Sequence, residues 1–433
     1  MSGVRFRIPK SIVNLSVFLF FLHLVPIDSI AGHLSLEDCV RMAKEHNPAL
    51  KTARWETAIT LQQTRLADSA IYPRIDFQGG YTAQLEAQAV KYNNQAMQMQ
   101  QPAFGFASLA IYQTIYDFGR RDSRISQSKT AEKVVESGIR AKEQDVAMQV
   151  VETYFGILQA RKLADAARDE LSTVNEHRKT AGILYDNGVV TRNDLLQADV
   201  RIASVKQKIL AIETTEKHLM LILNYLSGRK SDEDQTLIEP SDHEVKTVGG
   251  LSDDSAVSKR PDIEAIRRKI EISEYEVVDK KGYFFPEIFA RLNLDYLQND
   301  RMKEQAIYGA TVGLRINIFD GFATTASFGK AVASRSLARE QLRQFEEQAR
   351  MELQTAENDA AVSRERIGVA STSVAQAMEN LRINLNRYQE RAGTATEVMD
   401  AQTLLSQAKS EYYRAWYDFQ VSLARIRKAK GLL

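Results

Sequence analysis

Two stretches of this 433-residue chain contain no proline and only isolated glycines, and they limit its possible folds more than any other feature. They run from Arg120 to Leu184 and from Phe322 to Tyr388. As α-helix, a stretch of about 65 residues is a rod about 95–100 Å long. Such a rod is too long for a globular domain and needs partners packed along its sides. We therefore predict a mainly helical protein built around two very long helices.

The first rod also shows how its partners pack. Small and apolar residues recur every seven positions, and a second stripe follows four positions later. A sustained period of seven is typical of a coiled coil, and its many alanines allow helices to approach closely. The two stripes consist of Ile139, Val146, Thr153, Ala160, Ala167, Val174 and Ala181, and of Val150, Ile157, Ala164 and Leu171.

The chain reads as two copies of one unit. Pro48 and Pro73 are 25 residues apart, as are Pro261 and Pro286, and the similarity continues downstream of both pairs. Each copy predicts two helices, two strands, a very long helix and a long helix. The first copy has about ten extra residues within a Gln-, Asn- and Met-rich segment, 84–101, which we expect to be a polar loop. We expect repeats at 32–228 and 251–433, joined by a charged linker at 229–250.

Residues 1–31 have the pattern of an export signal. Arg5, Arg7 and Lys10 precede an apolar run of about a dozen residues, which is short for a membrane-spanning helix. Ser29 and Ala31 are small residues at the −3 and −1 positions of a signal-peptide cleavage site, so we predict cleavage after Ala31. A retained membrane anchor is the alternative. Cys39 is the only cysteine, which excludes an intramolecular disulfide, and we expect it to be a small buried helix residue.

Four segments alternate apolar and polar residues, as strands do when only one face is apolar. The pattern fits a transmembrane β-barrel, although half-buried strands of a soluble sheet show the same period. The export signal favours the barrel. Four strands are too few to close one, so the barrel reading requires several subunits. The segments are Ile75 to Glu86, Leu109 to Tyr116, Ile288 to Tyr296 and Ala310 to Ile318.

Doubled motifs make the sequence similar to the TolC-type outer-membrane efflux proteins, the outer-membrane factors of tripartite export systems. The resemblance covers nearly the whole mature chain. It rests on short motifs whose order recurs in both halves. They are Asn47-Pro48 with Arg260-Pro261, Tyr72-Pro73 with Phe285-Pro286, Asp117-Phe118-Gly119-Arg120 with Asp320-Gly321, and Tyr185 to Ala198 with Tyr388 to Gln402.

The resemblance implies a homotrimer with one twelve-stranded outer-membrane β-barrel and a periplasmic α-helical tunnel. It also implies a passive exit duct for efflux or type I secretion, working with a periplasmic adaptor (membrane fusion) protein and an inner-membrane transporter. The barrel would contact outer-membrane lipid. The exported substrate and the transporter class stay open. The alternative is a secreted coiled-coil scaffold or adhesin without channel activity.

The resemblance also places functional residues at the turns that end the two rods. Asp194, Glu397 and Asp400 match acidic residues that constrict the tunnel, and Tyr388 matches a gating tyrosine. The residues alone offer another interpretation, because Thr191-x-x-Asp194 and Thr394-x-x-Glu397 are capping boxes that start helices. We expect adaptor docking at Gly188, Val189, Val190, Ala392, Gly393 and Thr394.

The second turn departs from the family pattern. Arg391 stands where the first turn has Gly188, and Gly393 stands where some members carry a gate-locking arginine. Whether Arg391 replaces that arginine stays open.

Composition argues against other functions. A formal net charge of +1 gives no basic face for nucleic acid. The histidines show no metal-ligand spacing, and no nucleophile or phosphate-binding motif is present. We expect neither catalysis nor a metal or other cofactor.

Overall fold

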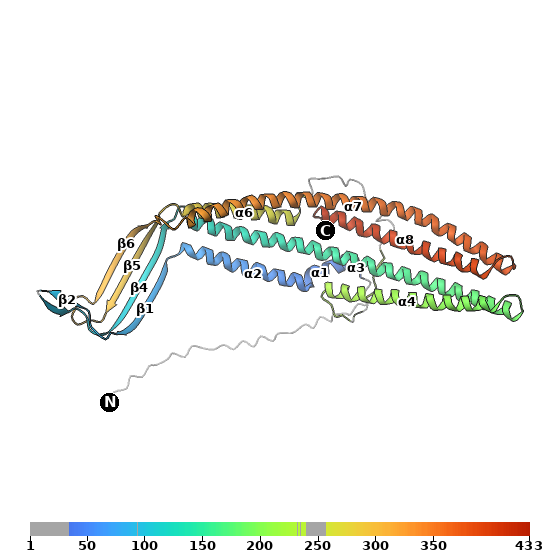
Figure 1. The fold of residues 1–433 in the computed structure, drawn as a ribbon, viewed down its shortest axis with the longest axis horizontal. Helices are drawn as coiled ribbons and strands as arrows, with labels where there is room; N and C mark the ends of the chain where they lie inside the picture. Colours follow the sequence, from blue (N-terminus) through green and yellow to red (C-terminus); the bar gives the residue numbers. More distant parts are fainter. Residues whose placement is uncertain (1–33, 93, 232, 234, 240–256) are drawn as a thin grey trace, which may run out of the picture.

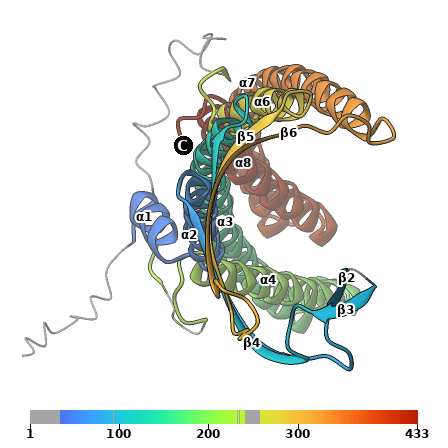
Figure 2. The ribbon, with the colours of Figure 1, turned by 90° about the vertical axis from the view of Figure 1, so that its left-hand side faces the viewer.

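The computed structural model describes residues 34–92, 94–231, 233, 235–239 and 257–433. The predicted export signal and most of the second half of the predicted linker lie outside these residues. The molecule is elongated, with a small sheet at one end and helices running away from it (Figure 1). Viewed from the sheet end, sheet and helices follow one curved wall rather than enclosing a compact core (Figure 2).

Two very long helices form the frame, as predicted from the breaker-free stretches. Helices α3 and α7 have 67 residues each, which corresponds to about 100 Å. Helices α4 and α8 have 35 residues each and run back along them (Figure 1). The helix bounds are α1 Leu36–His46, α2 Pro48–Asp68, the 3₁₀ helix η1 Ser69–Ile71, α3 Arg120–Asp186, α4 Arg192–Leu226, α6 Pro261–Gly282, α7 Ala323–Gln389 and α8 Ala395–Ala429.

Shorter helices cover the long ones from end to end. Near the sheet, α3 packs against α2 and α6, and farther along it packs against α4 and α8. Helix α7 packs first against α6 and then against α8. The predicted coiled-coil seam of α3 is confirmed, because the residues of its first stripe from Val146 to Ala181 are buried. Cys39 is buried on α1, as expected.

The sheet has four antiparallel strands in the order β1-β4-β5-β6, so β1 and β6 are its edges. The central pair, β4 and β5, joins the first half of the chain to the second. A separate hairpin consists of β2 and β3. The strand bounds are β1 Arg74–Ala83, β2 Ala89–Tyr92, β3 Gln95–Gln98, β4 Ala103–Tyr116, β5 Glu287–Leu297 and β6 Ala306–Arg315.

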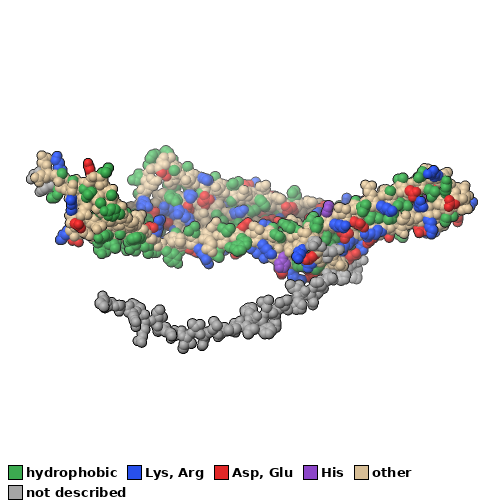
Figure 3. Space-filling view, turned by 90° about the horizontal axis from the view of Figure 1, so that it is seen from below, with side chains coloured by type: hydrophobic (Ala, Val, Ile, Leu, Met, Phe, Trp, Pro, Cys, Tyr) green, Lys and Arg blue, Asp and Glu red, His purple; other side chains and the backbone are tan. Residues whose placement is uncertain are grey.

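The predicted alternation places one apolar face on this sheet. Ile75 is paired with Ile111, which is also paired with Leu292. Because side chains alternate along a strand, these residues share a face. Many apolar side chains on this face are exposed, among them Phe77 and Val312 at 73% and 76%. Figure 3 shows hydrophobic side chains gathered at the sheet end and charged ones scattered along the helices.

Several local predictions were wrong. Segment 84–101 contains the hairpin β2–β3, not only a loop. Strand β4 begins six residues before Leu109, and β6 spans Ala306–Arg315, so Ile316 and Ile318 lie beyond it. A bulge between Thr114 and Tyr116 pairs Tyr116 with Ile288 on the apolar face, where simple alternation had placed Ile115.

Among the described residues, no helix combines the length and the apolar character needed to cross a membrane.

Candidate functional site

The two helical hairpins turn at the same end of the molecule, which we call the tip (Figure 1). Both turns close in the same way. After α3, the amide of Gly188 donates to the carbonyl of Tyr185, and the amide of Val189 donates to that of Leu184, each at 2.8 Å. After α7, the amides of Arg391 and Ala392 donate to the equivalent carbonyls at 3.1 and 2.7 Å. Both are Schellman motifs, which satisfy the last carbonyls of a helix.

Arg391 takes the conformation that glycine takes in the first turn. Its φ is 65°, and the φ of Gly188 is 71°. The left-handed region suits glycine and is unfavourable for residues with a β-carbon. The second tip turn is therefore strained at Arg391. The Arg391 side chain is exposed to solvent.

Asp194 and Glu397 form the capping boxes that the sequence predicts. The backbone amide and the hydroxyl of Thr191 both donate to Asp194, at 2.9 and 3.0 Å. The amide of Thr394 donates to Glu397 at 3.0 Å, and the amide of Glu397 donates back to the Thr394 hydroxyl at 3.3 Å. Both carboxylates thus start helices at the tip, where the positive end of the helix dipole favours them.

Glu397 also has a cationic neighbour that the sequence argument missed. The Arg387 guanidinium lies 3.7 Å from the Glu397 carboxylate and donates to the carbonyl of Ala392 at 3.0 Å. Arg387 therefore ties the end of α7 to the start of α8. Asp400 is exposed one turn farther along α8. Arg387 and Glu397 stand at i and i+10 across the turn, a spacing with no standard motif.

Tyr388 is the buried centre of the tip. Only 4% of it is exposed, and it packs in an apolar cluster with α8 and with Leu184 of α3. Its ring lies 4.7 Å from that of His177 on α3. Burial, and secondarily the Asp194 charge, raise the pKa of the Tyr388 hydroxyl. Tyr388 thus contacts both hairpins. The hydroxyl of Tyr388 has no hydrogen-bond partner, so it does not bond to Asp194. The apolar cluster comprises Leu381, Tyr388, Ala395, Val398, Ala401 and Leu405.

The expected docking residues all belong to the two turns at the tip. Gly188, Val189, Ala392 and Thr394 are exposed, and Val190 and Gly393 are half-buried. The two turns are linked by a hydrogen bond of 3.4 Å from Thr396 on α8 to Gln197 on α4. The tip therefore presents one surface formed by both hairpins, in which these uncharged residues lie beside exposed charged side chains such as Arg192 and Arg391.

A buried charge fastens the hairpins together farther from the tip. Glu170 on α3 is 1% exposed and is bonded to Arg201 and Lys208 on α4, at 2.5 and 3.3 Å. The hydroxyl of Ser406 on α8 donates to the same carboxylate at 2.5 Å. Three helices thus meet at one carboxylate. Glu170 lies outside both stripes of the predicted seam, so the sequence pattern did not single it out.

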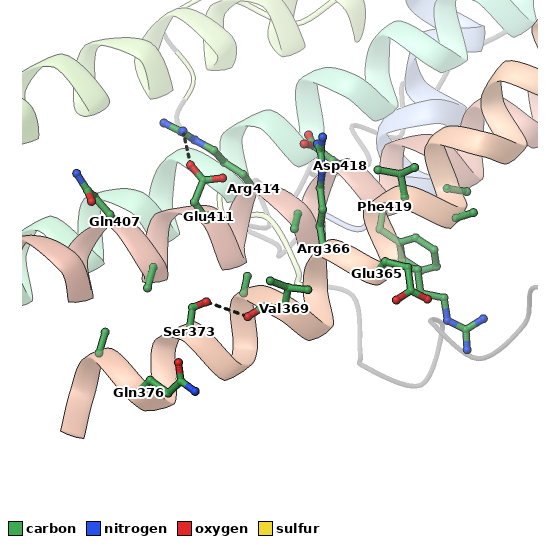
Figure 4. Close-up of a pocket in the computed structure, with 18 of the residues that line it drawn as sticks. Glu365, Arg366, Val369, Ser373, Gln376, Gln407, Glu411, Arg414, Asp418 and Phe419 are labelled. Atoms are coloured by element: carbon green, nitrogen blue, oxygen red, sulfur yellow. Dashed lines mark hydrogen bonds and ion pairs between the residues drawn. The ribbon is translucent and has the colours of Figure 1, made fainter. Parts of the chain in front are cut away.

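A long groove of about 1680 Å³ lies between α7 and α8 (Figure 4). Small residues form much of its lining, and charged residues such as Glu365 and Arg414 stand among them. The Arg414 guanidinium donates to Glu411 at 3.3 Å. Small side chains beside an open groove leave room for another helix to approach. Its small lining residues are Ala360, Ala361, Ala370, Ser373, Ala377, Ala408 and Ala415.

The described residues contain no group of three or more His, Cys, Asp or Glu side chains able to hold a metal ion. The groups that the structure brings together at the tip are the two helix caps, the ion pair of Arg387 with Glu397, and the buried pair of His177 and Tyr388.

Comparison with known proteins identifies the family. The outer membrane efflux protein family matches residues 39–218 and 254–432, which is most of the chain and both halves of it. The chain belongs to the outer membrane efflux protein family. The resemblance to TolC-type proteins is thereby confirmed.

Relatives of this family member align over nearly their whole length. The outer membrane efflux protein BepC of Brucella suis is 22% identical over 404 residues, covering 90% of this chain and 83% of BepC. The alkaline protease secretion protein AprF of Pseudomonas aeruginosa is 19% identical over 430 residues, covering 97% and 89%. A crystal structure of CusC, described in connection with transmembrane channel formation, superposes with a TM-score of 0.82 at 19% identity and covers 92% of each chain.

Proposed function

We propose that this outer-membrane protein is the channel subunit of an efflux or type I secretion system. The observation that carries this function is the sheet with an exposed apolar face at one end of rods about 100 Å long. Exposed apolar area of this extent marks a lipid or protein contact. An outer-membrane channel with a periplasmic helical extension uses both parts of the molecule.

The closed channel is a homotrimer. The free edges of β1 and β6 would expose unpaired backbone groups in lipid, so each edge pairs with a neighbouring subunit. Three copies supply twelve strands, enough to close a barrel. The helices offer matching surfaces, because α4 carries exposed apolar residues and α7 and α8 leave an open groove. The exposed apolar residues of α4 are Leu196, Val200, Leu210, Leu221, Ile222 and Tyr225.

The two structural repeats, 32–228 and 251–433, each give the subunit two strands of the four-stranded sheet and one long hairpin arm. Each half contributes one helix of 67 residues and one of 35 residues. Equal arms place both turns at one level, which a tunnel with a single closing point requires. We include the linker 229–250 in neither arm.

The tip is the gate and the adaptor docking site. In three copies, Asp194, Glu397 and Asp400 form rings of carboxylates, which favour cations. Arg387 neutralises part of the Glu397 ring. A periplasmic adaptor docks on the exposed turns, and an inner-membrane transporter supplies the cargo and the energy. The duct itself needs no cofactor and catalyses no reaction.

A gel and a planar bilayer test the channel. The mature protein should require detergent, run as a heat-modifiable trimer and conduct ions. The double variant Tyr388→Phe with Asp194→Ala should raise single-channel conductance by loosening the tip. Glu136→Ala, at an exposed position of α3 far from the tip, serves as control. A monomer that stays soluble without detergent would instead support the scaffold or adhesin alternative.

Docking has a separate test. Replacing Val189 and Ala392 with glutamate should abolish co-purification with an adaptor, because both side chains are exposed at the turns. Replacing Leu337, which is exposed near the sheet end of α7, with glutamate should leave it intact. Unchanged co-purification of the tip variant would move the docking site away from the turns.

A further inference from the structure

A histidine and a tyrosine are buried against each other between the two hairpins near the tip. His177 on α3 and Tyr388 on α7 are each only 4% exposed. Their ring centroids are 4.7 Å apart, and their planes are inclined by 52°. The pair therefore joins the first hairpin to the second at the level where the proposed gate closes.

Each ring carries a polar atom with no hydrogen-bond partner. These atoms are Nε2 of His177 and the hydroxyl oxygen of Tyr388. Buried polar groups in folded proteins are nearly always hydrogen-bonded, because an unpaired one costs about 1–3 kcal/mol. Two apolar side chains would fill the same space without this cost. An adjacent, unpartnered pair at the proposed gate therefore calls for a function.

The groups that face His177 come from two other helices. Asp194 at the start of α4 acts on it electrostatically, and Tyr388 comes from α7. The α8 residues packed around Tyr388 are apolar, among them Ala395 and Val398. Burial lowers the pKa of His177, and the Asp194 charge partly opposes this effect. The imidazole is thus neutral in the closed tip at neutral pH.

We propose that neutral His177 is a positioning residue that holds Tyr388 between the hairpins, and that its protonation releases the tip. The inference rests on the proposed channel function. A buried imidazolium with no partner for its Nε2 proton would be strongly unfavourable. Protonation therefore drives His177 toward water, and the apolar contact that Tyr388 makes with α3 is lost with it.

The sign of the pH effect follows from linkage. His177 has a lowered pKa in the closed tip and its ordinary pKa of about 6.5 when exposed to water. The open tip therefore binds a proton at a higher pH than the closed tip does. Acid favours opening, in a window that begins near pH 6.5 and extends below it.

Single-channel recording of the purified trimer between pH 7.5 and 5 tests the proposal. Wild-type conductance or open probability should rise severalfold as the pH falls through this window. His177→Phe and His177→Gln should both flatten the pH profile. Two variants are used so that the test still stands if one of them fails to fold. His218→Gln is the matched control, because His218 is an exposed histidine on α4. It should keep the wild-type profile.

A second variant separates this effect from titration of the carboxylate rings. Asp194→Asn removes the charge that favours protonated His177 in the closed tip, so the pKa of His177 there falls further below that in the open tip, and acid-induced opening should become larger in the same window. Opening driven by the carboxylate rings would instead become smaller. A pH profile unchanged in both His177 variants would overturn the inference and leave the channel function intact. A trimer that conducts at no pH would overturn the channel function and this inference with it.

Discussion

At the scale of single residues, Arg391 gives the tip a strained turn. Its left-handed backbone costs about 1 kcal/mol more than glycine would. We expect Arg391→Gly to stabilise the second turn by roughly 0.5 kcal/mol, since added freedom in the unfolded chain offsets part of the gain. Gly188→Arg should destabilise the first turn by roughly 0.5 kcal/mol, since the reduced freedom of the unfolded chain offsets part of the cost.

Hydrogen exchange of the Ala392 and Val189 amides measures both effects locally, since these amides close the two turns. Protection should rise for Ala392 in Arg391→Gly and fall for Val189 in Gly188→Arg. If the protection of the Ala392 amide did not rise in Arg391→Gly, backbone strain at Arg391 would be relieved in some other way.

The sequence predicted the residues of the tip that act on near neighbours. Thr191 with Asp194 and Thr394 with Glu397 are each three positions apart, so both capping boxes were readable. The pair of His177 with Tyr388 was not, because more than 200 residues separate them and only the packing of α3 beside α7 and α8 joins them. A pattern can report what a helix does locally, but not which side chain faces it from another hairpin.

At the scale of elements, Glu170 fastens α3 to α4 and α8 through three partners, which are Arg201, Lys208 and Ser406. Glu170→Ala should leave Arg201 and Lys208 without their carboxylate and destabilise the helical part by about 2 kcal/mol. We reduce the usual cost of a broken buried pair because both cations are partly exposed. Denaturant unfolding of the trimer in detergent measures the change.

Asp165→Ala provides the matched control one turn earlier on α3. Asp165 pairs with Arg168 on the surface, where an ion pair contributes little. Its loss should cost less than about 0.5 kcal/mol. If the two variants unfold alike, the network around Glu170 does not hold the hairpins together.

The elements themselves were predicted to different degrees. Both long helices were readable because they lack breakers over about 65 residues, and the structure ends them within two residues of the expected positions. The hairpin β2–β3 was missed because its polar strands show no apolar alternation. The bulge at Ile115 was missed because it depends on pairing with β5, a strand from the other half of the chain.

At the scale of the whole molecule, the two faces of one strand should respond differently to the same charge. Leu292 lies on the apolar face of β5, and the neighbouring Asn293 lies on the polar face, where it donates to Asp295 at 2.5 Å. In a membrane-embedded sheet, a lysine facing lipid near the midplane costs about 2–4 kcal/mol per strand. Leu292→Lys should therefore sharply reduce trimers in the outer-membrane fraction.

Asn293→Lys should still assemble, because its charge faces the water-filled interior beside Asp295. Three copies would add three positive charges to the lumen, so cation selectivity in planar bilayers should fall. The two positions are adjacent in sequence and receive the same side chain, so strand propensity and size are matched. If both variants assembled equally well, the apolar face would not be in contact with lipid, and the trimeric channel would lose its main support.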